Sequence, residues 1–266
     1  PTSNETGKGD CCDTDDGCPS ESLAFEGLLP VTKRKLCRLR VAKIIPETAD
    51  VKTLRLVACH GGGIPFSYLP GQFLTFTLPV GEKPIRRSYT ISSSPTQGYY
   101  CEVTVKREEH GAGSRYLHDQ VSIGDTLEVV APSGRFTFTG AEADDIVLIA
   151  GGVGITPMMS IARALSDMCW QGDIDFIAAC RDPEHFIFET ELRRLQECNE
   201  KLRLHVAMSR IDADRNGYHH GRLTKEMLTE WVPNLKSKRV HICGAPARVE
   251  ATQAMLAELN VPPENI

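Results

Sequence analysis

The strongest constraint on the fold is a change of sequence pattern near residue 141. From residue 34 up to that point, the chain consists of short β-branched or alternating runs separated by turns rich in Gly and Pro. Six such runs at this spacing predict a small antiparallel β-barrel. The predicted strands are 38–44, 53–59, 72–78, 88–92, 100–106 and 126–130, and one short helix is predicted around 114–120.

After residue 141, buried strands alternate with helical segments. Such alternation implies βαβ units and a doubly wound parallel α/β sheet. The predicted strands are 145–150, 174–180, 202–209 and 240–243, and each is followed by a helix. We therefore expect two domains, 34–140 and 141–266, after an acidic leader over 1–33. Ligands of such sheets bind at the carboxyl ends of the strands, so the residues just after each strand are candidate site residues.

Charge and hydropathy exclude several classes of protein. Residues 1–33 hold seven acids and two bases, which accounts for the whole net charge of −5. The remainder is neutral, which argues against a nucleic-acid-binding protein. No apolar run approaches the ~20 residues that a membrane-spanning helix requires. Hydrophobic residues make up 41% of the chain, enough for a sizeable core.

The ten cysteines indicate a reduced protein rather than a disulfide framework. Most of them stand singly in apolar runs, and no secretory signal is recognisable, so we expect a cytoplasmic protein. Cys11, Cys12 and Cys18 cluster in the leader, either as a metal site or simply as part of a flexible tail. Their spacing fits neither zinc nor iron–sulfur patterns, which favours the tail and predicts no metal in this chain.

A glycine-rich loop joins the first strand of the α/β half to its helix. Gly151, Gly152 and Gly154 would let backbone N–H groups approach a phosphate at the helix N-terminus, and Pro157 suits the first helical turn. The alternative is that these glycines serve packing only. The third glycine of the dinucleotide-binding fingerprint is absent.

A second candidate site is the run from Arg86 to Ser93. It could be a plain strand with alternating hydroxyl groups. The functional alternative is that Arg87 pairs with a phosphate, Tyr89 packs against a planar ring and Thr90 bonds a ring nitrogen.

Six motifs in order resemble those of the ferredoxin–NADP reductase superfamily, with the closest similarity to bacterial oxygenase reductases and hybrid-cluster-protein reductases. The resemblance covers about residues 34–266. The motifs are Arg87-x-Tyr89-Thr90-x-x-Ser93 with Val103–Lys106, Gly111–Ser114, Gly151–Pro157, Cys180-Arg181, Ser209-Arg210 and Cys243-Gly244.

The resemblance implies a barrel that binds FAD. Arg87, Ser88, Tyr89 and Thr90 would hold the isoalloxazine and its phosphate. Thr104, Val105 and Lys106 would contact the flavin mainly through their backbone groups. Gly113 and Ser114, at a helix start, would bind the pyrophosphate, which favours FAD over FMN.

The resemblance also implies that NADH or NADPH binds the α/β half. Thr90 and Cys243 would be the catalytic residues, with Cys243 beside the reactive carbon of the nicotinamide; the alternative for Cys243 is a buried thiol at a strand end. Arg210 would read a 2′-phosphate, or else pair with Asp212 or Asp214. The implied nucleotide-binding residues are Gly151, Gly152, Gly154, Thr156, Cys180, Arg181, Ser209, Arg210, Cys243 and Gly244.

Two departures from the family pattern stand out. Arg248 replaces a family methionine, which predicts an altered docking surface. Multidomain relatives continue past a segment like 261–266 into a [2Fe–2S] domain, and no Cys-x4-Cys-x2-Cys spacing occurs here. The expected partner is therefore an iron–sulfur protein or a fused [2Fe–2S] domain that is not present in this chain.

Three functions remain open at this point. The first is a flavin-dependent NAD(P)H reductase that delivers single electrons to an iron–sulfur acceptor. The second is a non-catalytic, flavin-binding electron-transfer subunit of a larger complex. The third is a nucleotide-binding interaction module without flavin.

Overall fold

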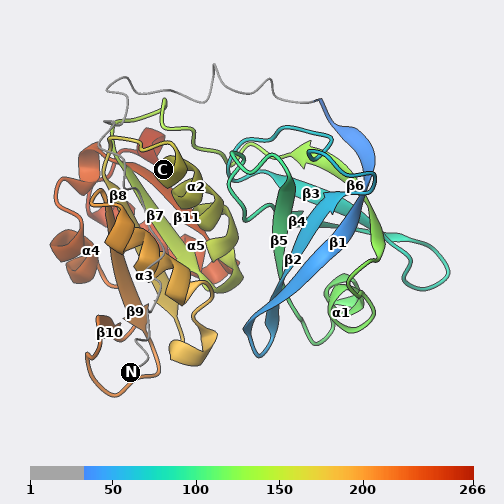
Figure 1. The fold of residues 1–266 in the computed structure, drawn as a ribbon. Helices are drawn as coiled ribbons and strands as arrows, with labels where there is room; N and C mark the ends of the chain where they lie inside the picture. Colours follow the sequence, from blue (N-terminus) through green and yellow to red (C-terminus); the bar gives the residue numbers. More distant parts are fainter. Residues whose placement is uncertain (1–32) are drawn as a thin grey trace, which may run out of the picture.

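The computed structural model describes residues 33–266, which form two sheets side by side (Figure 1). The first sheet, with strands β1–β6 and helix α1 over residues 35–133, is called the β-domain here. The second, with strands β7–β11 and their helices over residues 146–258, is called the α/β-domain. The predicted leader lies almost wholly outside the described residues, and so do Cys11, Cys12 and Cys18.

The β-domain is a six-stranded antiparallel sheet in the order β4-β3-β6-β1-β2-β5. Alternation explains its core: Leu74, Phe76 and Leu78 of β3 are fully buried, whereas the residues between them are half-buried. The elements are β1 (Lys35–Thr48), β2 (Val51–Ala58), β3 (Phe73–Leu78), β4 (Ile85–Thr90), β5 (Tyr100–Lys106), α1 (Ala112–Asp119) and β6 (Thr126–Ser133).

The sheet curls until its two edges meet. β4 and β5 stand at opposite ends of the strand order, yet Ile91 forms a bridge with Val103, and Ser92 N donates to Glu102 O at 2.8 Å. The predicted antiparallel six-stranded fold is therefore confirmed. β1 is longer than predicted because its first half pairs with β6 and its second half with β2.

The α/β-domain is a parallel sheet in the order β10-β9-β8-β7-β11, as the strand–helix alternation predicted. It has five strands rather than four. The extra strand, β10, has only three residues, too few to show a periodicity. The elements are β7 (Ile146–Gly151), α2 (Ile155–Asp167), β8 (Ile174–Cys180), α3 (Glu189–Cys198), β9 (Leu202–Met208), β10 (Tyr218–His220), α4 (Lys225–Trp231), β11 (Arg239–Cys243) and α5 (Pro246–Glu258).

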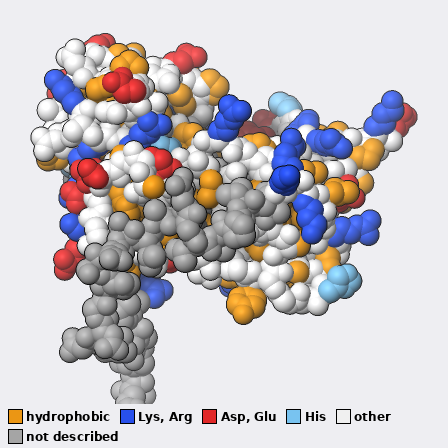
Figure 2. Space-filling model, turned by 90° about the horizontal axis from the view of Figure 1, so that it is seen from above, with side chains coloured by type: hydrophobic (Ala, Val, Ile, Leu, Met, Phe, Trp, Pro, Cys, Tyr) orange, Lys and Arg blue, Asp and Glu red, His pale blue; other side chains and the backbone are white. Residues whose placement is uncertain are grey.

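Positive charge lies on the outside of the β-domain. Exposed Lys and Arg side chains follow one another along the start of β1: Lys33, Arg34, Lys35, Arg38, Arg40 and Lys43. In the view from above, Lys and Arg gather over the half of the molecule that contains the β-domain (Figure 2). None of the helices in residues 33–266 is both long and apolar enough to cross a membrane.

Candidate active site

A cleft of about 520 Å³ opens between the two domains. It is large enough for an aromatic ring system and a second planar ring, since ligand pockets typically measure about 300–1,000 Å³. Most of the predicted site residues line it. They are Ser88, Tyr89, Thr90, Thr104 and Lys106 from the β-domain, and Gly151, Gly152, Gly154, Thr156, Cys180, Arg181, Cys243 and Gly244 from the α/β-domain.

Arg87, Tyr89 and the first turn of α1 pack together beside this cleft. A Cβ on Gly113 would lie 2.7 Å from Cγ of Arg87 and 3.3 Å from the hydroxyl of Tyr89, so only glycine allows this approach. The Arg87 guanidinium is exposed, donates to the carbonyl of Arg86 at 2.7 Å, and forms no ion pair with any described carboxylate. A cation thus stands at a helix N-terminus with hydrogen-bond donors to spare.

Ser114, by contrast, uses its side chain within its own turn. Its hydroxyl donates to Gly111 O at 3.0 Å and accepts from the backbone N–H of Glu108 at 3.1 Å. Ser114 is buried. Its side chain therefore shapes the start of α1, and only its backbone N–H is left as a donor to an anion there.

The three predicted residues of β5 differ in how they can reach a ligand. Val105 is fully buried in the β-domain core, so a ligand could meet only its backbone. The hydroxyl of Thr104 is already bonded to those of Thr53 and Ser92, at 2.7 Å and 3.0 Å. Lys106 pairs with Glu108 at 3.2 Å. The side chains of all three residues are thus occupied by contacts within the protein.

The three glycines of the loop after β7 serve three different purposes. A Cβ on Gly154 would lie 2.4 Å from the carbonyl oxygen of Cys243, so this glycine allows β11 to approach. A Cβ on Gly151 would collide with the Arg248 side chain. Gly152 has φ +58° and open space around it. Packing thus accounts for two of the glycines, whereas Gly152 has open space where a side chain would stand and needs glycine for its backbone conformation.

Two half-buried thiols, those of Cys243 and Cys180, stand at the floor of the cleft. Burial raises the pKa of Cys243, only partly offset by the backbone N–H of Gly244, and it raises the pKa of Cys180 to about 12. Burial therefore favours the protonated, neutral form of both thiols. Thr156, also in the wall, donates its hydroxyl to Val153 O at 3.0 Å.

A second cleft, of about 460 Å³, continues from the first along the ends of β7, β8, β9 and β11. Ser209 and Arg210, two of the predicted nucleotide-binding residues, line it. Arg222, which directly follows Gly221 after β10, also lines it and was missed, because β10 itself was not recognised. Arg210 forms no ion pair with Asp212, Asp214 or any other described carboxylate. Asp214 instead pairs with His219 at 3.4 Å.

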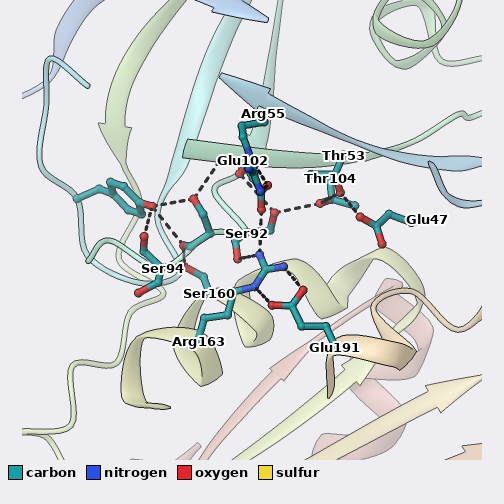
Figure 3. Close-up of polar contacts among 12 residues, drawn as sticks. Glu47, Thr53, Arg55, Ser92, Ser94, Glu102, Thr104, Ser160, Arg163 and Glu191 are labelled. Carbon is teal, nitrogen blue, oxygen red and sulfur yellow. Dashed lines mark hydrogen bonds and ion pairs between the residues drawn. The ribbon is translucent and has the colours of Figure 1, made fainter. Parts of the chain in front are cut away.

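A polar network joins helix α2 to the β-domain (Figure 3). Arg163 binds Glu191 through two nitrogens at 2.6 and 2.7 Å, donates to Ser92 O at 2.7 Å and lies 3.4 Å from Glu102. One turn earlier, Ser160 donates to Ser93 O at 2.8 Å. Residues three apart share one face of a helix, so this face of α2 is turned to the β-domain.

This network fixes the geometry of the first cleft. Helix α2 begins at the glycine loop, and Ser92 follows Thr90 by two residues. The contacts therefore hold the nucleotide-side loop and the strand that carries Arg87, Tyr89 and Thr90 in one arrangement. In the sequence, the sign of this network was a polar residue at every third or fourth position of an otherwise apolar helix, and it was not recognised there.

Comparison with known proteins identifies both halves of the chain. Residues 38–138 match the oxidoreductase FAD-binding domain, and residues 148–254 match the oxidoreductase NAD-binding domain. The chain is a member of this FAD- and NAD-binding oxidoreductase family. The predicted resemblance is thereby confirmed, together with FAD as the cofactor and a pyridine nucleotide as the second ligand.

Individual relatives agree. The chain is 34% identical to the glycine betaine monooxygenase reductase subunit of Chromohalobacter salexigens, over 82% of its own length and 59% of that protein. It is also 34% identical to NADH oxidoreductase HCR of Escherichia coli, over 84% of this chain and 65% of that one. The chain thus spans only about three fifths of the length of these curated relatives.

Two solved structures extend the likeness to three dimensions. The FAD/NAD-binding domain of nitric oxide dioxygenase from Vibrio cholerae matches with a TM-score of 0.79 and 25% identity, covering 86% of this chain and 96% of that one. Phthalate dioxygenase reductase matches with a TM-score of 0.68 and 26% identity, covering 84% of this chain and 64% of that one.

Within residues 33–266, no group of three or more His, Cys, Asp or Glu side chains could hold a metal ion.

Proposed function

We propose that this protein is a reductase that oxidises NADH or NADPH at an FAD and passes the electrons singly to an iron–sulfur or similar acceptor. The observation that carries the proposal is the first cleft, where the Tyr89–Thr90 strand of the FAD-binding domain faces the Thr156 and Cys243 region of the NAD-binding domain. A hydride donor and a hydride acceptor both have to reach one point, and this cleft is shared by the two binding domains.

The residues present fit FAD. Gly113 admits Arg87 and Tyr89 to the N-terminus of α1, where a pyrophosphate would meet backbone N–H groups, the helix dipole and a guanidinium without an acidic partner. Tyr89 is half-buried, and its ring packs edge-on against Phe76 with centroids 5.7 Å apart. Its orientation is therefore fixed before any ligand stacks on it.

FAD, when bound, supplies the redox chemistry by accepting a hydride and releasing electrons one at a time. The protein's part is positioning. Tyr89 and Thr90 would orient one ring, and Thr156 and Cys243 would bound the space for the other. A neutral thiol at Cys243 adds no charge beside the nicotinamide, and hydride transfer needs no general acid or base. Reacting atoms held about 3–3.5 Å apart account for most of the rate in such a step.

The acceptor is proposed to be an iron–sulfur protein or a fused [2Fe–2S] domain. Support comes from the relatives: one is named as the reductase subunit of a monooxygenase, and the phthalate dioxygenase reductase structure is described as transferring electrons from pyridine nucleotides to [2Fe–2S]. We further propose the cytoplasm as its location, since Cys37, Cys59, Cys101, Cys180 and Cys243 are free thiols.

The proposal is tested on the purified chain by adding NADH or NADPH with ferricyanide or cytochrome as acceptor. We expect a yellow protein, bleaching of its flavin absorbance by the nucleotide without oxygen, and steady-state turnover with the acceptor. A yellow protein that neither nucleotide reduces would instead be a non-catalytic electron-transfer subunit. A colourless protein that still binds nucleotide, even after incubation with FAD, would be an interaction module.

A further inference from the structure

The second cleft is strongly cationic. Its lining contains four arginines, namely Arg181, Arg210, Arg222 and Arg248, and no Asp or Glu. None of the four forms an ion pair with a described carboxylate. Guanidinium groups gathered in one concave site repel one another, so an anion bound in the cleft would relieve this repulsion.

Two of these arginines, Arg181 and Arg248, stand where the two clefts join. Both line the two clefts, and so do Gly151, Ala179 and Cys243. Beyond this shared wall, the first cleft leads to Tyr89 and Thr90, and the second leads to Ser209 and Arg210. A dinucleotide that extends through both clefts carries its pyrophosphate between its two rings, which is at the shared wall.

The local structure around Arg248 is built to hold its side chain there. Its Nη1 donates to the carbonyl of Ala179 at 3.1 Å, at the end of β8. Its side chain lies over Gly151 so closely that a Cβ on that residue would sit 2.2 Å from Nη1 and 2.5 Å from Cδ. One contact thus orients the guanidinium and leaves its other donors for a ligand.

Arg248 also occupies an electrostatically unfavourable position in its helix. It is the third residue of α5, in the first turn of a 13-residue helix that has no acidic residue in that turn. A cation at a helix N-terminus is destabilising by about 0.3–1 kcal/mol, because it meets the positive end of the helix dipole. A bound anion would reverse the sign of this effect, since it would interact favourably with the helix N-terminus and the guanidinium together.

We propose that Arg248, which among the arginines of the shared wall is the one at a helix N-terminus, binds the pyrophosphate of the nicotinamide nucleotide. This inference rests on the proposed function, because it assumes that a pyridine dinucleotide occupies both clefts. It assigns Arg248 to the nucleotide rather than to the partner-docking surface that the sequence suggested. It also separates two uses of charge in one cleft: Arg248 binds a group common to NADH and NADPH, whereas Arg210 is placed to read the 2′ position.

The test is calorimetric binding of ADP-ribose and 2′-phospho-ADP-ribose to the flavin-loaded protein. Both ligands contain the pyrophosphate and neither can be oxidised. Arg248→Met should weaken both by the same factor, on the order of tenfold to a hundredfold, the range for a lost charge-assisted hydrogen bond. Arg248→Lys should recover part of the loss. Arg210→Met, the matched control in the same cleft, should weaken only the phosphorylated ligand.

The outcomes separate this inference from the function on which it rests. If the wild type binds neither ligand, the proposed function fails. If the wild type binds and Arg248→Met binds ADP-ribose within twofold of it, the assignment of Arg248 is wrong while the function stands. A folding defect is excluded by thermal unfolding without ligand, where Arg248→Met should unfold close to the wild type because the lost hydrogen bond to Ala179 O and the removed helix-dipole contact act in opposite directions.

Discussion

Arg163 and Arg248 lie on two helices of the same domain but in opposite electrostatic surroundings. The Arg163 side chain is only 13% exposed and meets two carboxylates and a backbone carbonyl. Arg248 is exposed, has one carbonyl partner and shares its cleft with three more arginines. The difference separates two functions of one residue type: a guanidinium with its counter-ions in place holds the fold together, whereas one without them is left for a ligand.

The largest effect should come from breaking the paired arginine. Arg163→Met removes the partner of Glu191 and one of the two partners of Glu102, whose side chain is only 6% exposed. Loss of one member of a buried ion pair costs about 3–5 kcal/mol, and we expect about 3 kcal/mol here because Arg55 still pairs with Glu102. Urea unfolding followed by circular dichroism measures the change.

Arg107→Met is the matched control for this variant. Arg107 pairs with Asp119 through two nitrogens, at 2.8 and 2.9 Å, but both side chains lie at the surface. Exposed ion pairs contribute little to stability, so this variant should unfold close to the wild type. A loss for Arg163→Met no larger than that of its control would show that the network does not stabilise the contact between the domains.

Sequence reasoning singled out the candidate ligand-binding arginines more readily than it found the structural one, Arg163. Arg87, Arg181 and Arg210 stand in motifs with fixed neighbours in the chain, so their places could be read directly. The partners of Arg163 come from β5, α3 and the segment after β4, and no local pattern connects these segments. Arg222 was missed for a related reason: it follows a strand of three residues that forms only because β9 lies beside it.

The β-domain also contains an arginine without a described carboxylate partner, Arg87. Arg87→Ala should lose flavin, because an unpaired guanidinium beside the N-terminus of α1 is expected to bind phosphate. We expect affinity for FAD to fall by about tenfold to a hundredfold, the range for a charge-assisted hydrogen bond. The ratio of flavin absorbance to protein absorbance after purification measures the loss.

Arg86→Ala is the matched control, because successive residues of a strand point to opposite faces and only Arg87 contacts Gly113. This control should keep its flavin. The α/β-domain of Arg87→Ala should still bind ADP-ribose, since the two domains have largely separate hydrophobic cores and only Val51 of the β-domain packs into the core of the α/β-domain. Full flavin absorbance in Arg87→Ala would show that Arg87 does not bind the flavin phosphate.

The third prediction separates two arginines within the second cleft. Arg210→Ala should lower kcat/KM for NADPH about tenfold more than kcat/KM for NADH, because only NADPH offers a 2′-phosphate to the guanidinium. Arg248→Met serves as the comparison and should affect both nucleotides equally. Equal losses in Arg210→Ala would mean that Arg210 does not read the 2′ position.

The smallest effect is a change of stability with pH, and it concerns a second paired cluster around Asp175 of β8, whose side chain is fully buried. Burial alone would raise the pKa of this carboxyl, but His205, Arg203 and Lys238 around it outweigh burial and hold the pKa well below its ordinary value. Lys238 Nζ and Arg203 Nε lie 2.8 and 2.7 Å from its two oxygens. A carboxyl whose pKa is depressed by folding stabilises the protein above its unfolded pKa, about 3.9, and this contribution falls as the pH drops below that value.

Asp175→Asn should therefore change the acid limb of the stability profile as well as the stability at neutral pH. The variant leaves Lys238, whose side chain is 5% exposed, without its counter-ion, so it should be less stable than the wild type at pH 7. Between pH 5 and pH 3 the difference in the free energy of unfolding between the two proteins should narrow by about 1 kcal/mol. The reason is that Asp175 becomes protonated in the unfolded wild type but stays ionised in the folded wild type. Urea unfolding at each pH measures this gap.

Asp214→Asn, which removes a carboxylate that is 66% exposed, is the surface control. A gap that stays constant with pH would mean that Asp175 has the same pKa in the folded and unfolded states. The basic residues around Asp175 would then not stabilise its ionised form.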